Sequence, residues 1–226
     1  MKLHLGCGLN AQKGWVNVDG SWGVLLAKYQ FLRRILRMLR IFPEQSVSIP
    51  WDPSIVFHDL RKKLPFASAS VGMIYCAHTL EHLYLDQARR LLEDCFRVLA
   101  PGGILRMVVP DLKAMALNYV APGPRDGSTG AKVMPADVFV EGLLLRAPSL
   151  PGRTFLHRLY YAFNDFQSHK WMYDADSLRS QFELAGFMKV QSMPYRESKI
   201  DDIDKVEQEG RHLDGPEIYI EGVKPF

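Results

Sequence analysis

The sequence predicts a single α/β domain built around a mostly parallel sheet. Its first 19 residues already carry the pattern: an apolar strand at 2–5, a turn with glycines at positions 6 and 8, and a second apolar strand at 15–18 that ends on Asp19. Helical and strand patterns follow one another along the rest of the chain, which is typical of a parallel sheet with crossover helices. At 226 residues the chain is long enough for one such domain with insertions.

Seven segments have strand character and two have clear helical character. The predicted strands are 2–5, 15–18, 55–58, 71–76, 104–109, 187–193 and 217–223, and the predicted helices are 86–99 and 174–185. Asp86 is the expected N-cap of the first helix, which Pro101-Gly102-Gly103 would end, and Gly186 would end the second helix. The last strand alternates apolar and polar residues, which predicts an antiparallel edge position.

The glycine turn and Asp19 predict a nucleoside-bearing ligand. Without a Cβ, Gly6 and Gly8 let the backbone approach a ligand closely, and a carboxylate at the tip of the next strand can hold both ribose hydroxyls. The glycines also resemble a dinucleotide fingerprint, but a diphosphate needs the N-terminus of a crossover helix. Only six residues separate Gly8 from Trp15, so the spacing favours S-adenosylmethionine over NAD. A nicotinamide-dependent oxidoreductase remains the alternative.

Composition narrows the class of protein further. A net charge of +3 is too small to indicate a nucleic-acid partner. The three cysteines, Cys7, Cys76 and Cys95, lack metal-ligand spacing and predict reduced thiols in a cytoplasmic protein. The chain opens directly on a strand, so no signal peptide is expected, and no apolar run reaches the roughly 18 residues that a membrane span needs.

Two insertions interrupt the alternation, at about 21–54 and 112–170. Residues 22–40 predict an amphipathic helix whose polar face is basic, with cations Lys28, Arg33, Arg34, Arg37 and Arg40. One interpretation is a lid helix packed on the domain, and another is a helix lying on an anionic membrane. Nucleic acid is disfavoured because no aromatic residues are interleaved with the arginines. The second insertion, with a Gly/Pro-rich loop at 121–130 and helical patterns around 136–146 and 154–166, is interpreted as a cap over the acceptor.

Five segments, in order, resemble the class I S-adenosylmethionine-dependent methyltransferases, and most of all the small bacterial type associated with polysaccharide synthesis. They are LHLGCGLN…GWVNVD (3–19), HDLRKKLPFASASVGMIYCAHTLEHL (58–83), FRVLAPGGILRMVVPDL (96–112), HKWMYDADSLRSQFELAGF (169–187) and the closing strand. The resemblance implies a Rossmann-like, doubly wound, seven-stranded sheet with an antiparallel last strand. It also implies methyl transfer from S-adenosylmethionine to a sugar, glycan or other small hydroxylated acceptor. The implied cofactor residues are Gly6, Cys7, Gly8, Asp19, Asp59, Leu60, Ala77 and His78.

Methyl transfer to oxygen needs a proton acceptor, and the candidates are His78, Asp111 and His169. His78 has a near-neutral reference pKa of about 6.5 and stands at the end of the fourth strand. Each candidate has a structural alternative: His78 and His82 as helix-start hydrogen-bonding residues, and Asp111 as a helix cap. No metal site is predicted, because no further ligands of suitable spacing accompany the two histidines. A member that binds the cofactor without turnover is the third function class.

Overall fold

The computed structural model describes residues 1–29, 31, 34, 35, 38, 49–121, 134–145, 168–207 and 215–226. Several predictions fall outside these residues. They concern Arg33, Arg37 and Arg40 of the basic helix, the Gly/Pro-rich loop after residue 121, and the helical pattern at 154–166.

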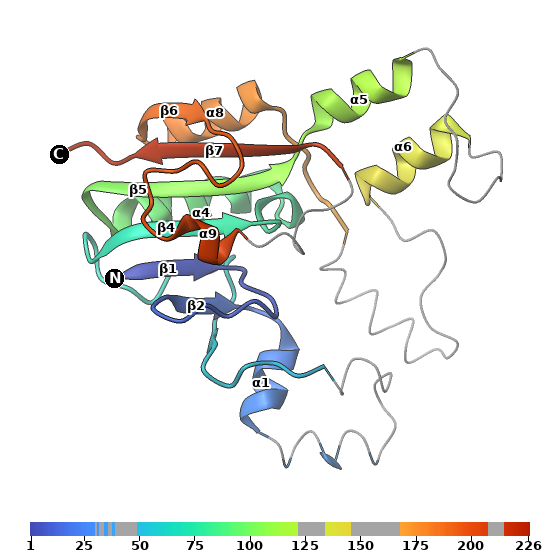
Figure 1. The fold of residues 1–226 in the computed structure, drawn as a ribbon. Coiled ribbons are helices and arrows are strands. Elements are labelled where there is room, and N and C mark those ends of the chain that lie inside the picture. The colour runs from blue at the N-terminus through green and yellow to red at the C-terminus, as the bar shows by residue number, and fades with distance from the viewer. Residues whose placement is uncertain are drawn as a thin grey trace.

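A seven-stranded mixed sheet forms the centre of the molecule, in the order β3-β2-β1-β4-β5-β7-β6 (Figure 1). Its strands are β1 (Lys2–Leu5), β2 (Val16–Asp19), β3 (Val56–Phe57), β4 (Val71–Ala77), β5 (Leu99–Pro110), β6 (Met188–Ser192) and β7 (Glu217–Val223). Strands β3, β2, β1, β4 and β5 pair in parallel, whereas β7 runs antiparallel to both β5 and β6. The predicted fold class is therefore confirmed, including the antiparallel last strand. The edge position predicted for that strand was wrong, because β6 pairs with its other side.

The side-chain alternation of the central strands gives the sheet two buried faces. In β4, Ile74 and Cys76 belong to one hydrophobic cluster while Tyr75 and Ala77 belong to another. Successive strand residues point to opposite faces, so both faces of β4 are covered. Helices α4 (Leu85–Val98) and α8 (Ala175–Leu184) contribute to the first cluster, and the short α9 (Ile203–Val206) contributes to the second.

Two helix and strand boundaries differ from the predictions. The N-cap of α4 is Tyr84 and not Asp86, whose carboxylate instead pairs with Arg90 in the first turns of the helix. Strand β5 begins at Leu99 and runs through Pro101-Gly102-Gly103, whereas the predicted strand begins only after these residues, at 104. The glycines stay in the strand because they pair with the chain end: the Gly102 N–H donates to the Lys224 carbonyl at 2.8 Å, and the Lys224 N–H donates to the Gly103 carbonyl at 2.9 Å.

Both insertions contain helices that lie near the carboxyl edge of the parallel strands. The first holds α1 (Trp22–Lys28), and the second holds α5 (Leu112–Val120) and α6 (Pro135–Leu143), which extend beyond the end of β5 (Figure 1). Helices α5 and α6 contact each other through the stacked rings of Tyr119 and Phe139, with centroids 5.0 Å apart. A ligand that enters this edge of the sheet therefore meets both insertions.

Among the described residues of the apolar stripe predicted for the basic helix, Leu25 and Leu26 are half-buried and two aromatic residues are on the surface. Val24 is the buried residue of α1, while Trp22 and Tyr29 are 57% and 61% exposed. Farther along the segment, Phe31 and Met38 are also exposed. Within the described part of the chain, no helix has the length and apolar character to cross a membrane.

Candidate functional site

A cleft of about 780 Å³ opens at the carboxyl ends of β1, β2, β3 and β4. Its lining residues are Gly6, Gly8, Asp19, Gly20, Ser21, Trp22, Phe57, Asp59, Leu60, Arg61, Lys62, His78, Thr79, His82, Leu83, Tyr84, Gln87 and Lys170. Six of the eight residues proposed for the cofactor are among them. The other two, Cys7 and Ala77, are buried in the packing behind this surface.

The glycine turn forms the wall of the cleft at the end of β1. Gly6 and Gly8 both have left-handed backbones, with φ of +63° and +56°. A Cβ on Gly6 would lie 1.9 Å from Thr79 Oγ1, so the position requires glycine for space as well as for conformation. Residues 6–15, all of them described, form turns and no helix. The turn therefore offers no helix N-terminus to a diphosphate, as the spacing predicted.

Asp19 is held in place by the backbone that surrounds the cleft. Its Oδ2 accepts a hydrogen bond from the Gly8 N–H at 2.8 Å, and its Oδ1 accepts one from the Ser21 N–H at 2.7 Å. A carboxylate has about four acceptor sites, so each oxygen can accept one more hydrogen bond. The arrangement suits two neighbouring hydroxyls, one for each oxygen.

The segment after β3, which pairs with β2, adds a carboxylate and several cations to the lining. Arg61 donates from Nε and Nη2 to the two oxygens of Asp59, at 2.8 Å each, and these hydrogen bonds hold the pKa of Asp59 below its usual value. Lys62 and Lys170 complete a basic rim that the sequence analysis did not assign to the site. The Arg61-Lys62-Lys63 run after the third strand was a local signal for this rim, whereas Lys170 had none.

His78 lies at the end of β4 between two carboxylates. Its backbone is left-handed (φ +48°), which is uncommon for a residue with a side chain and frequent at functional sites. Nε2 is 3.0 Å from Glu217 Oε1, and Nδ1 is 3.6 Å from Glu81 Oε1. Burial by itself would lower the pKa of His78, but Glu217 and Glu81 outweigh it and raise the pKa to about 9. The expectation of a near-neutral histidine was therefore wrong, because both partners come from outside the strand that carries it.

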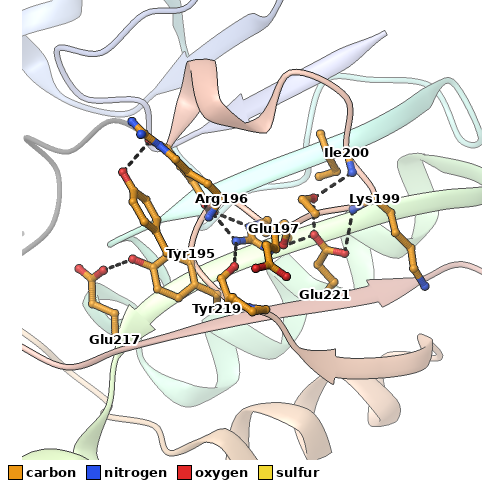
Figure 2. Close-up of polar contacts among 12 residues, drawn as sticks. Tyr195, Arg196, Glu197, Lys199, Ile200, Glu217, Tyr219 and Glu221 are labelled. Carbon is orange, nitrogen blue, oxygen red and sulfur yellow. Dashed lines mark hydrogen bonds and ion pairs between the residues drawn. The ribbon is translucent and has the colours of Figure 1, made fainter.

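Glu217 connects His78 to a second cleft of about 380 Å³, formed between α5, α6 and the start of β7. The lining residues are Pro110, Met115, Asn118, Tyr119, Val138, Phe139, Glu141, Gly142, Leu144, Gly215, Pro216 and Glu217. The Tyr219 hydroxyl donates to Glu217 Oε2, which orients the carboxylate (Figure 2). Since β7 is antiparallel, its first residue reaches the edge where the parallel strands end. Sequence reasoning missed Glu217 because that position depends on long-range pairing.

Asp111 acts as a helix cap. Its Oδ1 accepts a hydrogen bond from the Ala114 N–H at 3.1 Å, and its own N–H donates to the Pro216 carbonyl at 2.9 Å. Asp111 is absent from the described lining of both clefts, although the preceding residue, Pro110, lines the second. In the structure Asp111 therefore has the role of a helix cap, which was the alternative to its role as proton acceptor.

His169 lies behind His82, away from the mouth of the cleft. Its backbone N–H donates to the Leu144 carbonyl at 2.9 Å, and its ring meets the His82 ring edge-on with centroids 4.9 Å apart. Burial lowers the pKa of His169. Together with Glu81 it forms a cluster in which donor atoms of Glu81, His82 and His169 all lie within 4.8 Å of one another.

Comparison with known proteins gives one family match and a set of structural likenesses. Residues 35–107, from before β3 into β5, match a methyltransferase domain model. No curated protein is significantly similar in sequence.

Similar solved structures include an S-adenosylmethionine-dependent methyltransferase from Thermotoga maritima, described as a possible histamine N-methyltransferase. It is 14% identical over 99% of this chain and 81% of that one, with a TM-score of 0.44. A methyltransferase from Archaeoglobus fulgidus is 14% identical over 99% and 85% of the two chains, with a TM-score of 0.48. PigF, solved with SAH, is 17% identical over 99% and 49%, with a TM-score of 0.46.

Proposed function

Because the protein is an S-adenosylmethionine-dependent methyltransferase with a class I domain, we propose that it methylates a hydroxyl oxygen of a small acceptor, a sugar or glycan. The observation that supports this acceptor chemistry is the position of Glu217. This carboxylate lines the second cleft and contacts His78, which lines the first. A proton acceptor therefore stands where the two clefts approach each other.

The cofactor fits the first cleft in the orientation that the family resemblance implies. Asp19 would accept hydrogen bonds from the ribose hydroxyls, with Asp59 and Leu60 bordering the adenine. The backbone of Gly6 and Gly8 would face the methionine part. The sulfonium would then lie near His78, at the end of the cleft closest to Glu217. The cofactor supplies the reactive methyl group, and the protein aligns the acceptor with it.

The second cleft has the groups that a polyhydroxylated acceptor needs. Glu217 and Glu141 present carboxylates that accept hydrogen bonds from hydroxyls, and the rings of Tyr119 and Phe139 offer a flat apolar surface to a sugar face. In the reaction a bond forms between the acceptor oxygen and the methyl carbon while the methyl–sulfur bond breaks. The hydroxyl proton passes to Glu217, and the products are a methyl ether and S-adenosylhomocysteine.

His78 would serve this step as a positioning residue. With a pKa of about 9 its imidazole is protonated at neutral pH, so it holds no lone pair for the acceptor's proton. As a cation it donates to Glu217 and fixes the direction of that carboxylate. The role of general base thus moves from the histidine to its partner.

A product assay with matched variants tests the proposal. The protein is incubated with S-adenosylmethionine and a panel of sugars, glycans, amines and thiols of similar size, and mass spectrometry locates the methyl group. We expect O-methylated sugars. Glu217→Gln should lower kcat by 10²-fold or more, the usual scale of general-base loss. Glu141→Gln, which changes the other carboxylate of the same cleft, should alter mainly KM. Methylation restricted to nitrogen or sulfur, or equal kcat for both variants, would contradict the proposal.

We also propose that segment 22–40 brings the enzyme to an anionic membrane surface, where a lipid-linked glycan would be available. The exposed Trp22, Tyr29, Phe31 and Met38 support this, because a lid helix would bury such side chains against the domain. Flotation with anionic and neutral vesicles tests it. Binding should favour anionic vesicles, weaken when Arg33, Arg34 and Arg37 are changed to Gln, and persist in Lys13→Gln. No preference between the vesicles would refute the membrane contact.

A further inference from the structure

Glu81, His82 and His169 converge at the back wall of the first cleft. Glu81 and His82 belong to the 3-10 helix η1 (Leu80–His82), and His169 comes from a segment far along the chain. Two backbone hydrogen bonds join these segments: the N–H groups of Lys170 and Trp171 both donate to the Glu81 carbonyl, at 2.7 and 3.2 Å. These hydrogen bonds hold the two segments together and so keep the three side chains close to one another.

Two side chains in this cluster, Glu81 and His169, have buried polar atoms without the hydrogen bonds that burial normally requires. Glu81 is 0% exposed, and among the described residues neither of its carboxylate oxygens has a hydrogen-bond partner. The His169 Nδ1 atom is buried and unpartnered in the same way. A buried carboxylate with unused acceptor sites is costly unless a cation satisfies it. The His78 Nδ1 atom lies 3.6 Å from Glu81 Oε1, too far for a hydrogen bond.

His82 is oriented as metal-binding histidines are. Its Nδ1 lies 3.3 Å from the Ser168 carbonyl oxygen, a distance at which an Nδ1–H donates to that carbonyl. This hydrogen bond would fix the tautomer and leave Nε2 with a free lone pair. A backbone carbonyl on the distal nitrogen is the usual support for a metal-binding imidazole.

We propose that Glu81, His82 and His169 bind one divalent first-row transition-metal ion, with zinc as the representative. Two imidazole nitrogens and one carboxylate oxygen are the donor set of catalytic zinc sites and of related iron sites, whereas Mg²⁺ and Ca²⁺ prefer oxygen donors throughout. Donor atoms that now lie within 4.8 Å would approach to roughly 3–3.5 Å around an ion with bonds of about 2.0–2.2 Å.

Three protein ligands leave a coordination position for an external oxygen. His82 lines the cofactor cleft, so that position would be accessible from the cleft. The binding of the ion itself does not depend on the acceptor.

The experiment uses tag-free full-length protein, stripped with a chelator and dialysed, with no cofactor or acceptor present. Calorimetric titration with Zn²⁺ and the visible absorption of added Co²⁺ report binding, stoichiometry and ligand type. We expect one equivalent per chain, with a Co²⁺ spectrum of nitrogen and oxygen ligation. Glu81→Gln and His169→Gln should each weaken binding at least tenfold. The control is His58→Gln, which removes another imidazole with a buried, unpartnered nitrogen, one that belongs to no cluster of potential metal ligands among the described residues. It should bind as the wild type does.

Absence of saturable binding to the wild type would overturn the proposal, as would affinities that His169→Gln and Glu81→Gln leave unchanged. If Glu81→Gln does not fold, His169→Gln and the Co²⁺ spectrum of the wild type still decide the matter. A bound ion without any O-methylated product would refute the proposed acceptor chemistry alone. O-methylation by a protein that binds no ion would refute the metal site alone.

Discussion

Two buried clusters of charged side chains in this molecule differ in whether their charged groups have hydrogen-bond partners. In the first, the fully buried Arg106 of β5 makes five hydrogen bonds. It donates to the carboxylates of Glu207 and Glu221 and to the carbonyls of Pro194 and Glu197. A guanidinium has five N–H donors, so none is left over. In the second, the carboxylate of Glu81 has no hydrogen bond among the described residues.

The carboxylates of the first cluster are satisfied as thoroughly as its arginine. The Arg196 N–H donates to Glu207 at 2.8 Å, and the Ser198 hydroxyl donates to Glu221. Figure 2 shows the loop that contains Arg196, Glu197 and Lys199 lying against Glu221 of β7. These hydrogen bonds hold the loop between β6 and α9 against the sheet.

The difference separates a structural site from a functional one. Where every donor and acceptor is paired within the chain, no ligand is needed to complete the cluster. Where the Glu81 carboxylate and the His169 Nδ1 are buried without hydrogen-bond partners among the described residues, beside a cleft and a left-handed His78, the missing partner is expected to come from outside. The predictions below test this distinction, starting with the largest expected effect.

Removal of the cation from the paired cluster should be severely destabilising. Arg106→Met would leave two buried carboxylates without their cation, and such losses cost about 3–5 kcal/mol of unfolding free energy. Urea denaturation measures the change. Arg90→Met serves as control: it breaks an exposed ion pair with Asp86 and should cost less than about 1 kcal/mol. Similar losses in the two variants would show that the buried network contributes nothing special.

Asp19 is intermediate between the two clusters. Both of its carboxylate oxygens accept a hydrogen bond from the backbone, and each can accept one more. Asp19→Asn keeps the shape but replaces one acceptor oxygen with an NH₂ group that opposes a backbone N–H. We expect the affinity for S-adenosylhomocysteine to fall at least tenfold, about 1.4 kcal/mol by calorimetry. Asp59→Asn, after the neighbouring strand β3, should cost less because Arg61 already occupies both oxygens. The reverse order would place the ribose at Asp59.

Asp174 represents a third kind of charge, half-buried and serving as the cap of its own helix. Its Oδ1 accepts from the Ser177 N–H at 2.7 Å as the cap of α8, and its pKa is lowered mainly by hydrogen bonding from Ser177. Asp174→Ala should cost about 1 kcal/mol at neutral pH. A carboxylate with a depressed folded pKa stabilises the protein above its unfolded pKa of about 3.9. The difference should therefore shrink as the pH falls through the folded pKa, and a difference independent of pH would contradict the assignment.

Sequence reasoning succeeded where the signal was local. Strand periodicity, the glycine turn and the carboxylate after β2 each occupy a few consecutive residues, and all lie where expected. It failed where two distant segments meet. The partner of His78 depends on the antiparallel register of β7, and the third donor beside Glu81 and His82 arrives with residue 169. Neither contact can be predicted from the spacing of residues within one segment.

The smallest predicted effect completes the comparison of the two buried clusters. In protein stripped of metal, Glu81→Gln removes a buried charge that makes no hydrogen bond among the described residues, and it leaves His78 paired with Glu217 at 3.0 Å. The substitution relieves the desolvation of the Glu81 carboxylate but also removes its long contact with His78. These two effects should nearly cancel, so the free energy of unfolding should change by less than about 1 kcal/mol. With zinc present, the wild type should gain stability by mass action and the variant should not. A loss of 3–5 kcal/mol in the stripped protein would instead make Glu81 a structural residue of the same kind as Arg106, and the distinction between the clusters would fail.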